Sequence, residues 1–403
     1  MRTALVGGTV IDGTGKAPQA NAAVVVEDGK IVEVGQASRL DAGVRVVDVT
    51  GKTVMPGIID THTHFAAWGS NLIGRHDSSL MLLAAETVHA LRTVLEAGVT
   101  TARDLGGLDP GFRDAVARGL IPGPRLHTSI IVVSPINGIL DFTTAQGMPT
   151  PMLPGHPRQE CSGPYECRAK VREVLRAGAD VIKIATSGGV SSRRLQPRQP
   201  IFTREEVEAI VDEAHMANVQ VTCHATGGPG LLMAVKAGVD TIEHGPYLDE
   251  ESVEEMAARG TWYVPTFAIY RWHSTKGPAY KQVRARALRD QHLRSFEQAR
   301  KAGVRITMGT DAGAYEPGDN MLELELLVEA GMTPMEAIEA STRVAAECVR
   351  MEPEIGTLEP GKEADLLVVD GDPLRDIRIL QERQRLTLVM QAGKAVGGGM
   401  RLA

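Results

Sequence analysis

The sequence predicts an α/β protein in which a (β/α)8 TIM barrel is joined to a small β-sandwich domain. Three observations support this fold class. In the middle of the chain, eight short apolar runs alternate with longer segments of helical periodicity, as in a parallel barrel. Both ends of the chain are instead rich in short strand-like runs separated by turn residues. Polar residues directly follow several of the apolar runs, where barrel proteins place their active-site side chains.

The two chain termini are predicted to build the β-sandwich together, from residues 1–55 and 356–403. In the N-terminal part, Glu27-Asp28-Gly29-Lys30 separates two valine-rich runs, which is the signal of a β-hairpin. In the C-terminal part, strands are predicted over Ala364–Val369, Leu386–Met390 and Gly393–Val396. Residues 56–355 form the predicted barrel domain.

The barrel strands are predicted in chain order over Val54–Ile59, Val99–Arg103, Leu126–Val133, Val181–Ile184, Val219–Cys223, Thr241–Glu243, Trp262–Phe267 and Arg305–Gly309. Helices between them are predicted over Leu80–Ala97, Tyr165–Ala177, Arg204–Ala217, Gly230–Ala237 and Ser252–Arg259. Thr203 and Glu206 have the spacing of a capping box, and Ala-Gly pairs before several strands predict glycine C-caps. Strict βα alternation favours a closed barrel, and a doubly wound open sheet is the alternative.

Composition and charge limit the classes of partner. A hydrophobic content of 43% and a charged content of 23% are ordinary for a soluble globular protein. A net charge of −7 without a basic block argues against nucleic-acid and anionic-membrane partners. No apolar run approaches the roughly 18 residues of a membrane span, and Gly7 and Gly8 interrupt the first run too early for a signal peptide. We therefore expect a cytoplasmic protein that forms a homo-oligomer and acts on a small molecule.

The four cysteines do not suggest a disulfide framework. Cys161 and Cys167 lie in one polar loop. They either pair or remain free thiols, and the free state is the favoured prediction.

Four histidines and one aspartate follow predicted strands and form the candidate metal site. His62 and His64 are two residues apart, so both imidazoles point to the same face of a strand. His224, His244 and Asp311 end three other predicted strands. Each one alone has a structural interpretation: a strand-end histidine is often a hydrogen-bonded core residue, and an aspartate can cap the next helix. Together they predict a metal site at the barrel mouth.

Lys183 is the sixth candidate ligand. Val181, Ile182 and Ile184 surround it, so its strand is predicted to be buried. Burial and nearby cations lower a lysine pKa and favour the neutral amine. A neutral amine reacts with CO₂ to give a carbamate, whose two oxygens are able to bridge two metal ions. The alternative is that Lys183 reaches the barrel mouth and pairs with an acid.

At these positions the sequence resembles the amidohydrolase superfamily, in its binuclear type with a carboxylated lysine. The branch that it resembles contains prolidase-like Xaa-Pro and Xaa-Arg/Lys dipeptidases and ochratoxin-hydrolysing amidases. The resemblance covers nearly the whole chain. The matching stretches are Asp60–His64, Thr100–Gly107, Gly178–Ile184, Ser187–Val190, Gly238–Gly245 and Gly356–Asp365.

The resemblance implies two divalent metal ions, Zn²⁺ first, with Mn²⁺, Fe²⁺ or Co²⁺ as alternatives. His62, His64 and Asp311 would hold one ion, and His224 and His244 the other. N6-carboxylysine at Lys183 would bridge them. A bridging hydroxide would attack an amide carbonyl, with Asp311 as general acid/base.

Two other activities are compatible with the same barrel, namely ring opening of a cyclic imide or amide and deamination of a heterocycle. Deaminases of the superfamily usually lack the bridging lysine, so Lys183 argues against deamination. A non-enzymatic scaffold is the remote alternative, and the presence of all six candidate ligands argues against it.

Substrate contacts are predicted at Ile139, Thr226, Arg194 and Tyr247. Ile139 stands where dipeptidase-like relatives often have a histidine, and Thr226 where they often have histidine or tyrosine. Both changes make the pocket more apolar and favour a bulky amide, carbamate or urea over a simple dipeptide. Arg194, in a cluster with Arg193 and Arg198, would bind a carboxylate, or the cluster is a solvated loop. Tyr247 would donate a hydrogen bond, or it packs in the wall.

Overall fold

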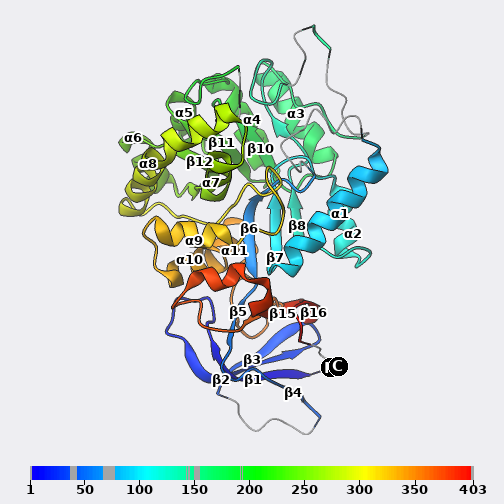
Figure 1. The fold of residues 1–403 in the computed structure, drawn as a ribbon. Coiled ribbons are helices and arrows are strands. Elements are labelled where there is room, and N and C mark those ends of the chain that lie inside the picture. Colours follow the sequence, from blue (N-terminus) through cyan, green and yellow to red (C-terminus); the bar gives the residue numbers. More distant parts are fainter. Residues whose placement is uncertain are drawn as a thin grey trace.

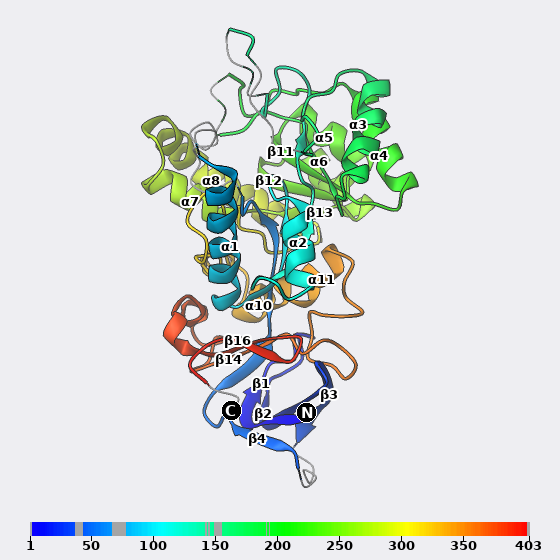
Figure 2. The same cartoon turned by 90° about the vertical axis from the view of Figure 1, so that its right-hand side faces the viewer.

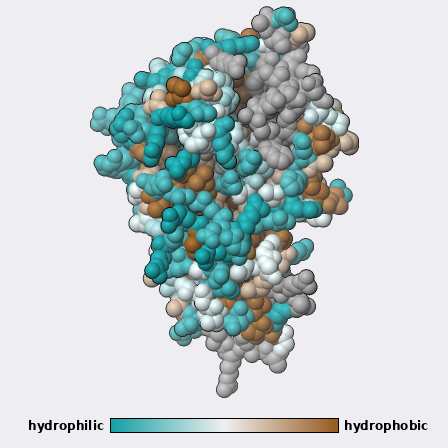
Figure 3. All heavy atoms as spheres, viewed as in Figure 1, coloured by the Kyte–Doolittle hydropathy of each residue, from teal (hydrophilic) through white to brown (hydrophobic). Residues whose placement is uncertain are grey.

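The structure is a computed structural model that describes residues 2–36, 43–66, 78–141, 143, 146–148, 155–190, 192 and 194–400. Strands from the two ends of the chain lie together at one end of the molecule, and the middle of the chain forms an α/β region above them (Figures 1 and 2). Among the described residues, no helix is both long enough and apolar enough to cross a membrane. On the face seen in Figure 3 most side chains are hydrophilic, and apolar ones are scattered.

The terminal region is one eight-stranded sheet to which both ends of the chain contribute. In spatial order its strands are β16 (Lys394–Gly397), β15 (Leu386–Gln391), β14 (Leu366–Val369), β5 (Thr53–Pro56), β1 (Thr3–Val10), β2 (Gln19–Glu27) and β3 (Lys30–Gln36), with β4 (Arg45–Asp48) on β1. The antiparallel pair β5–β14 joins the two ends of the chain. The side chains of Leu5, Val24 and Leu366 belong to a separate apolar core here. Because the strands form a single sheet, a sandwich of two sheets is not confirmed.

The predicted hairpin lies between β2 and β3, where Glu27 pairs with Lys30. Asp28 has a φ of 48° and Gly29 a φ of 86°. Positive φ at both central residues is the requirement of a two-residue hairpin turn, which asparagine, aspartate and glycine meet at least cost. The turn prediction is therefore confirmed.

The middle of the chain forms two parallel sheets with neighbouring strands in chain order. One contains β6 (Ile58–Thr63), β7 (Val99–Asp104) and β8 (Arg125–Thr128). The other contains β9 (Val132–Val133), β10 (Ile182–Ala185), β11 (Val221–Gly227), β12 (Thr241–Tyr247) and β13 (Trp262–Val264). Parallel strands carry their carboxyl ends at one edge, so the residues that follow them are brought together.

Three predicted strands differ from the structure. The run Val54–Ile59 is two strands in two sheets, β5 and β6, with Gly57 between them. The run Leu126–Val133 is interrupted between β8 and β9, where Ile130 has a φ of 63°. The segment Arg305–Gly309 forms no regular strand, although Thr307 N donates to Tyr263 O at 3.0 Å and Thr61 N donates to Met308 O at 3.2 Å. In the described part of the chain, the regular ladders thus do not form one closed eight-stranded barrel.

The helices agree with the prediction to within one or two residues where one was made. They are α1 (Leu80–Glu96), α2 (Pro110–Ala117), α3 (Pro164–Arg176), α4 (Arg204–Met216), α5 (Pro229–Ala237), α6 (Glu250–Arg259), α7 (Phe267–Thr275), α8 (Ala279–Lys301), α9 (Leu322–Glu329), α10 (Pro334–Ala340) and α11 (Arg343–Cys348). Short 3₁₀ helices span Ile377–Gln381 and Arg383–Arg385. Thr203 and Glu206 form the predicted capping box, and Gly238 is a left-handed C-cap with a φ of 95°.

Cys161 and Cys167 are buried free thiols whose sulfur atoms lie 3.4 Å apart. The predicted free state is therefore confirmed.

Candidate metal centre

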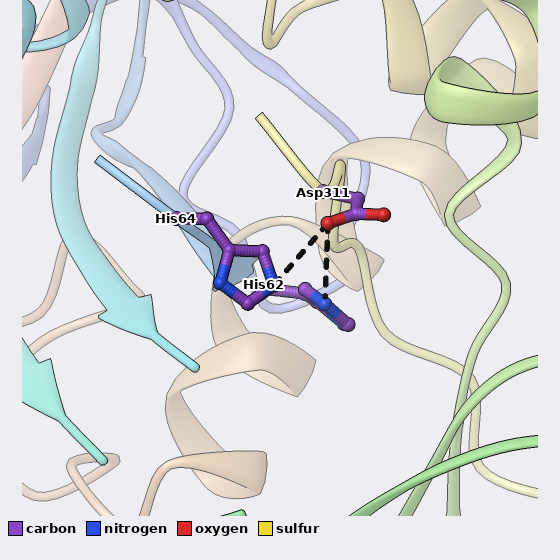
Figure 4. A group of neighbouring side chains, drawn as sticks. All are labelled: His62, His64 and Asp311. Atoms are coloured by element: carbon purple, nitrogen blue, oxygen red, sulfur yellow. Dashed lines mark ion pairs between the residues drawn. The ribbon is translucent and has the colours of Figure 1, made fainter. Parts of the chain in front are cut away.

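His62, His64 and Asp311 converge at the carboxyl end of β6 (Figure 4). One Asp311 Oδ1 atom lies 3.3 Å from His64 Nε2 and 3.6 Å from His62 Nε2. One donor atom from each of the three residues lies within 4.8 Å of the other two. This spacing suits a set of ligands around one cation. The structure thus brings together three of the predicted ligands, and their role as ligands stays a prediction.

His224 and His244 extend this group from β11 and β12. Their ring centroids are 4.6 Å apart, and the His244 ring is 5.0 Å from that of His62. His244 has a φ of 76° and Asp311 a φ of 61°. Residues other than glycine rarely adopt this left-handed conformation, which costs of order 1–3 kcal/mol and is concentrated at functional sites. The backbone is strained at two of the residues that form the cluster.

Neighbouring groups fix the orientation of the rings. His62 Nδ1 lies 2.6 Å from Glu243 Oε2, and His64 Nδ1 lies 2.9 Å from Gly106 O. His244 Nδ1 lies 2.7 Å from Thr266 Oγ1, whose own proton goes to Pro265 O. Each of these three imidazoles therefore donates from Nδ1 and presents an unprotonated Nε2. Hydrogen bonds of this kind hold metal-binding histidines in the correct tautomer.

Lys183 lies in β10 and is 2% exposed. Among the described residues, its Nζ has no hydrogen-bond partner. Burial lowers the pKa of Lys183 to about 8, although the charges of Glu243 and Asp311 oppose this shift. A buried ammonium without a partner is costly. The amine is therefore close to its neutral form at physiological pH, as the sequence predicted.

Burial also controls the charge of the histidines. It lowers the pKa of His64 to about 4 and that of His224 to about 3, and it brings those of His62 and His244 well below the usual range. All four rings are consequently neutral at pH 7, which is the form that binds metal ions. Burial raises the pKa of Asp311 to about 7, and the nearby charge of Lys183 opposes that rise.

A cavity of about 420 Å³ opens above these residues. All six predicted ligands line it. The apolar side chains of its wall are Val132, Ile139, Leu140, Val190, Ile269 and Ala314. The volume is in the usual range for sites that bind small molecules.

The predicted substrate contacts are only partly at this cavity. Ile139 lines it. Thr226 does not, because its buried hydroxyl bonds to Gly188 O at 3.2 Å and to Pro197 O and so holds the loop after β10. The expectation that Thr226 leaves room for substrate beside His224 is therefore wrong.

Two further predicted contacts also lie outside the cavity lining. The exposed Arg194 donates to Thr143 O at 3.1 Å. Tyr247 stands at the end of β12, with the guanidinium carbon of Arg198 5.8 Å from its ring centre. Both therefore take the structural interpretation. Arg193 lies outside the described residues.

Sequence reasoning missed two groups of residues. Glu243 is fully buried beneath the site, where it contacts His62 and, at 3.4 Å, Arg103 Nη2. Its position beside His244 was the available signal, because strand neighbours alternate faces and a buried acid needs a partner. The second group is Tyr270, His273, Tyr280 and Lys281, which line the cavity from α7 and α8. No motif marks them in the sequence.

Comparison with known proteins defines the class. Residues 53–396 match the amidohydrolase family. An ochratoxinase of Aspergillus niger is 35% identical over 98% of this chain and 87% of its own length. The crystal structure of that protein superposes with a TM-score of 0.88, covering 99% of this chain and 96% of the other. A Xaa-Pro dipeptidase with bound methionine gives a TM-score of 0.89 at 31% identity, covering 98% and 99% of the two chains.

The chain therefore belongs to the amidohydrolase family, and it is an enzyme of the hydrolase class. Its fold is the mixed α/β fold of that family. The similarity to both an ochratoxinase and a prolidase-like protein confirms the branch that the motifs predicted.

Proposed function

We propose that the enzyme hydrolyses a non-ring amide C–N bond in a small substrate of the N-acyl amino acid, dipeptide-like, carbamate or urea type. The observation that carries the proposal is the buried Lys183 amine, which has no hydrogen-bond partner among the described residues and lies in a cavity with four neutral histidines and Asp311. The similarity to an ochratoxinase and to a Xaa-Pro dipeptidase supports the same reaction class.

The residues fit two divalent cations, with Zn²⁺ as the expected ion. Imidazole nitrogen and carboxylate oxygen are ligands that zinc accepts, as do Mn²⁺, Fe²⁺ and Co²⁺. His62, His64 and Asp311 would hold one ion, and His224 and His244 the other. The Lys183 amine would add to CO₂, lose one proton and become an N6-carboxylysine that bridges both. When bound, the ions supply an activated water and polarise the scissile carbonyl.

Asp311 holds and moves the proton. Its Oδ1 lies beside His62 and His64, and burial raises its pKa to about 7. A carboxylate with this pKa accepts a proton from the attacking water and delivers it to the leaving nitrogen near neutral pH. Both transfers use the same side chain, so no second acid is required.

The wall of the cavity favours an apolar acyl group. Ile139, Val132 and Val190 contribute to it, and burial of apolar surface is worth about 25 cal/mol per Å². These side chains do not compensate the charged amino end of a free dipeptide for its lost hydration. Aromatic or large aliphatic N-acyl compounds are thus the preferred substrates.

We also infer that the two parallel sheets are parts of one (β/α)8 barrel. Its third strand would be interrupted at Ser129–Ile131, and residues 305–309, which bond to β13 and β6, would be the eighth strand. On this proposal the barrel domain spans residues 56–355, and residues 1–55 and 356–403 form the β-domain.

Metal content and turnover test the function together. Purified protein should contain about two divalent ions per chain and hydrolyse aromatic N-acyl amino acids. Lys183→Ala should lose most activity, and short carboxylic acids should restore part of it by supplying the missing bridge. Lys301→Ala is the control, because Lys301 is an exposed residue at the end of α8. Full activity of metal-replete Lys183→Ala, or no amide hydrolysis by the metal-loaded wild type, contradicts the proposal.

A further inference from the structure

The first turn of α8 places a buried cation in the cavity wall. Lys281 is 8% exposed and lines the cavity together with Tyr280. Among the described residues that line the cavity, Lys183 and Lys281 are the lysines, and there is no arginine. If Lys183 is carboxylated, Lys281 is the remaining cationic side chain of this lining.

The position of Lys281 is costly in an empty site. A buried ammonium loses most of its hydration, at a cost of several kcal/mol unless other groups replace it. The first turn of α8 contains no acidic residue, and a cation in the first turn of a helix is disfavoured by the helix dipole. An anion bound in the cavity would offset both effects.

The helix that carries Lys281 is firmly placed at the cavity. Arg284, one turn further along α8, donates to Ser192 O at 2.6 Å and to Val190 O at 3.3 Å. These bonds fix the loop after β10 against α8. Because residues three apart lie on the same face of a helix, Lys281 is held on the side of α8 that faces this loop and the cavity.

Lys281 also lies close to the residue assigned to proton transfer. Burial raises the pKa of Asp311, and the charges of Lys183 and then Lys281 oppose that rise. Burial lowers the pKa of His273 to about 3, and Lys281 adds to the effect. His273 is thus neutral at pH 7, which leaves Lys281 as the charge on this part of the wall.

The apolar part of the wall lies beside a different histidine. A Cβ at Gly189 would lie 2.6 Å from Ile139 Cδ1 and 3.1 Å from His224 Nε2, so Ile139 is next to His224. The ring of Tyr270, in α7, is instead 6.2 Å from that of His244. The cavity therefore has an apolar part near His224 and a polar, cationic part near His244 and Asp311.

We propose that Lys281 binds the carboxylate of the leaving amino acid, so that the enzyme prefers N-acyl amino acids with an apolar acyl group and a free α-carboxylate. This proposal rests on the amide hydrolase function proposed above. The α-carboxylate is two bonds from the leaving nitrogen, which Asp311 protonates, and a cation near Asp311 is within its reach. The acyl group then packs against Ile139. Lys281 is a specificity residue that acts through substrate binding.

Two substrates that differ only in the carboxylate test the role of Lys281. N-benzoyl-L-phenylalanine has it, and N-(2-phenylethyl)benzamide lacks it. In the metal-loaded enzyme, Lys281→Met should raise KM for the first by roughly 10- to 100-fold, the range of a charged hydrogen bond. It should change kcat much less and should leave the second substrate within about twofold. Lys281→Arg should recover part of the loss, and Lys301→Met, at the other end of α8, should behave like the wild type.

Other outcomes overturn the proposal. Equal losses on both substrates, or unchanged KM for N-benzoyl-L-phenylalanine, would show that Lys281 has a structural role. Thermal unfolding of each variant checks the fold, and Lys281→Gln replaces Lys281→Met if that variant does not fold. If the wild type hydrolyses neither compound, the proposed function has failed in its own right. Calorimetric binding of N-benzoyl-L-phenylalanine to wild type and Lys281→Met then decides the anchor without turnover, and equal affinities reject it.

Discussion

At the residue scale, the candidate ligands were predictable because chemistry and position agree. His62 and His64 share a strand face, and the other candidates end strands, so their meeting at one point followed from the topology. Thr226 and Arg194 were assigned from alignment-like position alone, and the structure uses them to hold loops. Hydroxyl and guanidinium groups have many backbone partners within reach, so their sequence position does not fix their role.

Asp311→Asn tests the proton-transfer role. The amide keeps the shape of the side chain but accepts no proton, so kcat should fall by about 10²–10⁴-fold while KM changes little. Steady-state kinetics of metal-loaded enzyme provide the measurement, with metal content determined on the same samples. An asparagine variant that keeps its metal and a nearly normal kcat would remove Asp311 from the mechanism.

Ile139→His tests the apolar wall. Ile139 lines the cavity next to His224, and a histidine there would give a polar partner to the charged end of a dipeptide. The ratio of kcat/KM for free dipeptides to that for aromatic N-acyl substrates should therefore rise. Ile139→Leu keeps the wall apolar and is the matched control. The inference from this position is wrong if the native enzyme already hydrolyses free dipeptides at least as well.

At the element scale, helices and turns followed the sequence more closely than strands did. The capping box at Thr203 and the Asp28-Gly29 turn are local, since they depend on residues a few positions apart. The division of Val54–Ile59 into β5 and β6 depends on which distant strands pair with each half. Nothing within the run shows this change of partner. The same limit applies to residues 305–309, which are apolar like a strand but form only isolated bridges.

The N-terminus of α7 depends on a buried acid. Glu323 in α9 accepts hydrogen bonds from Phe267 N at 2.8 Å and Ala268 N at 2.6 Å. Burial nevertheless raises its pKa from 4.5 to about 8, against the effect of these bonds. In the unfolded chain Glu323 ionises near 4.5, whereas in the folded protein it ionises near 8. Its contribution to stability is therefore complete below about pH 4.5 and is lost as the pH rises to about 8.

Glu323→Gln removes this titration. The variant should be less stable at pH 5, because glutamine leaves one backbone N–H without an acceptor, a loss of about 1–3 kcal/mol. The deficit should shrink between pH 5 and 8 by at most about 1.4 kcal/mol per pH unit. Urea unfolding of metal-free wild type and variant at pH 5, 6.5 and 8 measures the difference. A deficit that stays constant over this range would contradict the raised pKa.

At the scale of the whole molecule, the pairing of the two chain ends was the less local prediction, and the sheet contains strands from both. The alternation of apolar runs gave the order of the parallel strands, which neighbour one another as in the chain. Composition did not reveal that the terminal strands form a single sheet, because one sheet and two packed sheets require the same alternation of apolar residues. Nor did it reveal the α7–α8 wall, whose residues reach the cavity only through long-range packing.

The connection through Gly57 has a consequence for biosynthesis. β5 lies between β1 and β14, and it leads within a few residues to β6 and His62. Gly57 N also donates to Asp365 O at 2.9 Å. While the ribosome is still making the chain, β5 has no C-terminal neighbour until residues 365–369 have emerged. The strand that carries the first two histidines is thus anchored on both sides only near the end of translation, so the centre captures its metal ions as one of the last events of maturation.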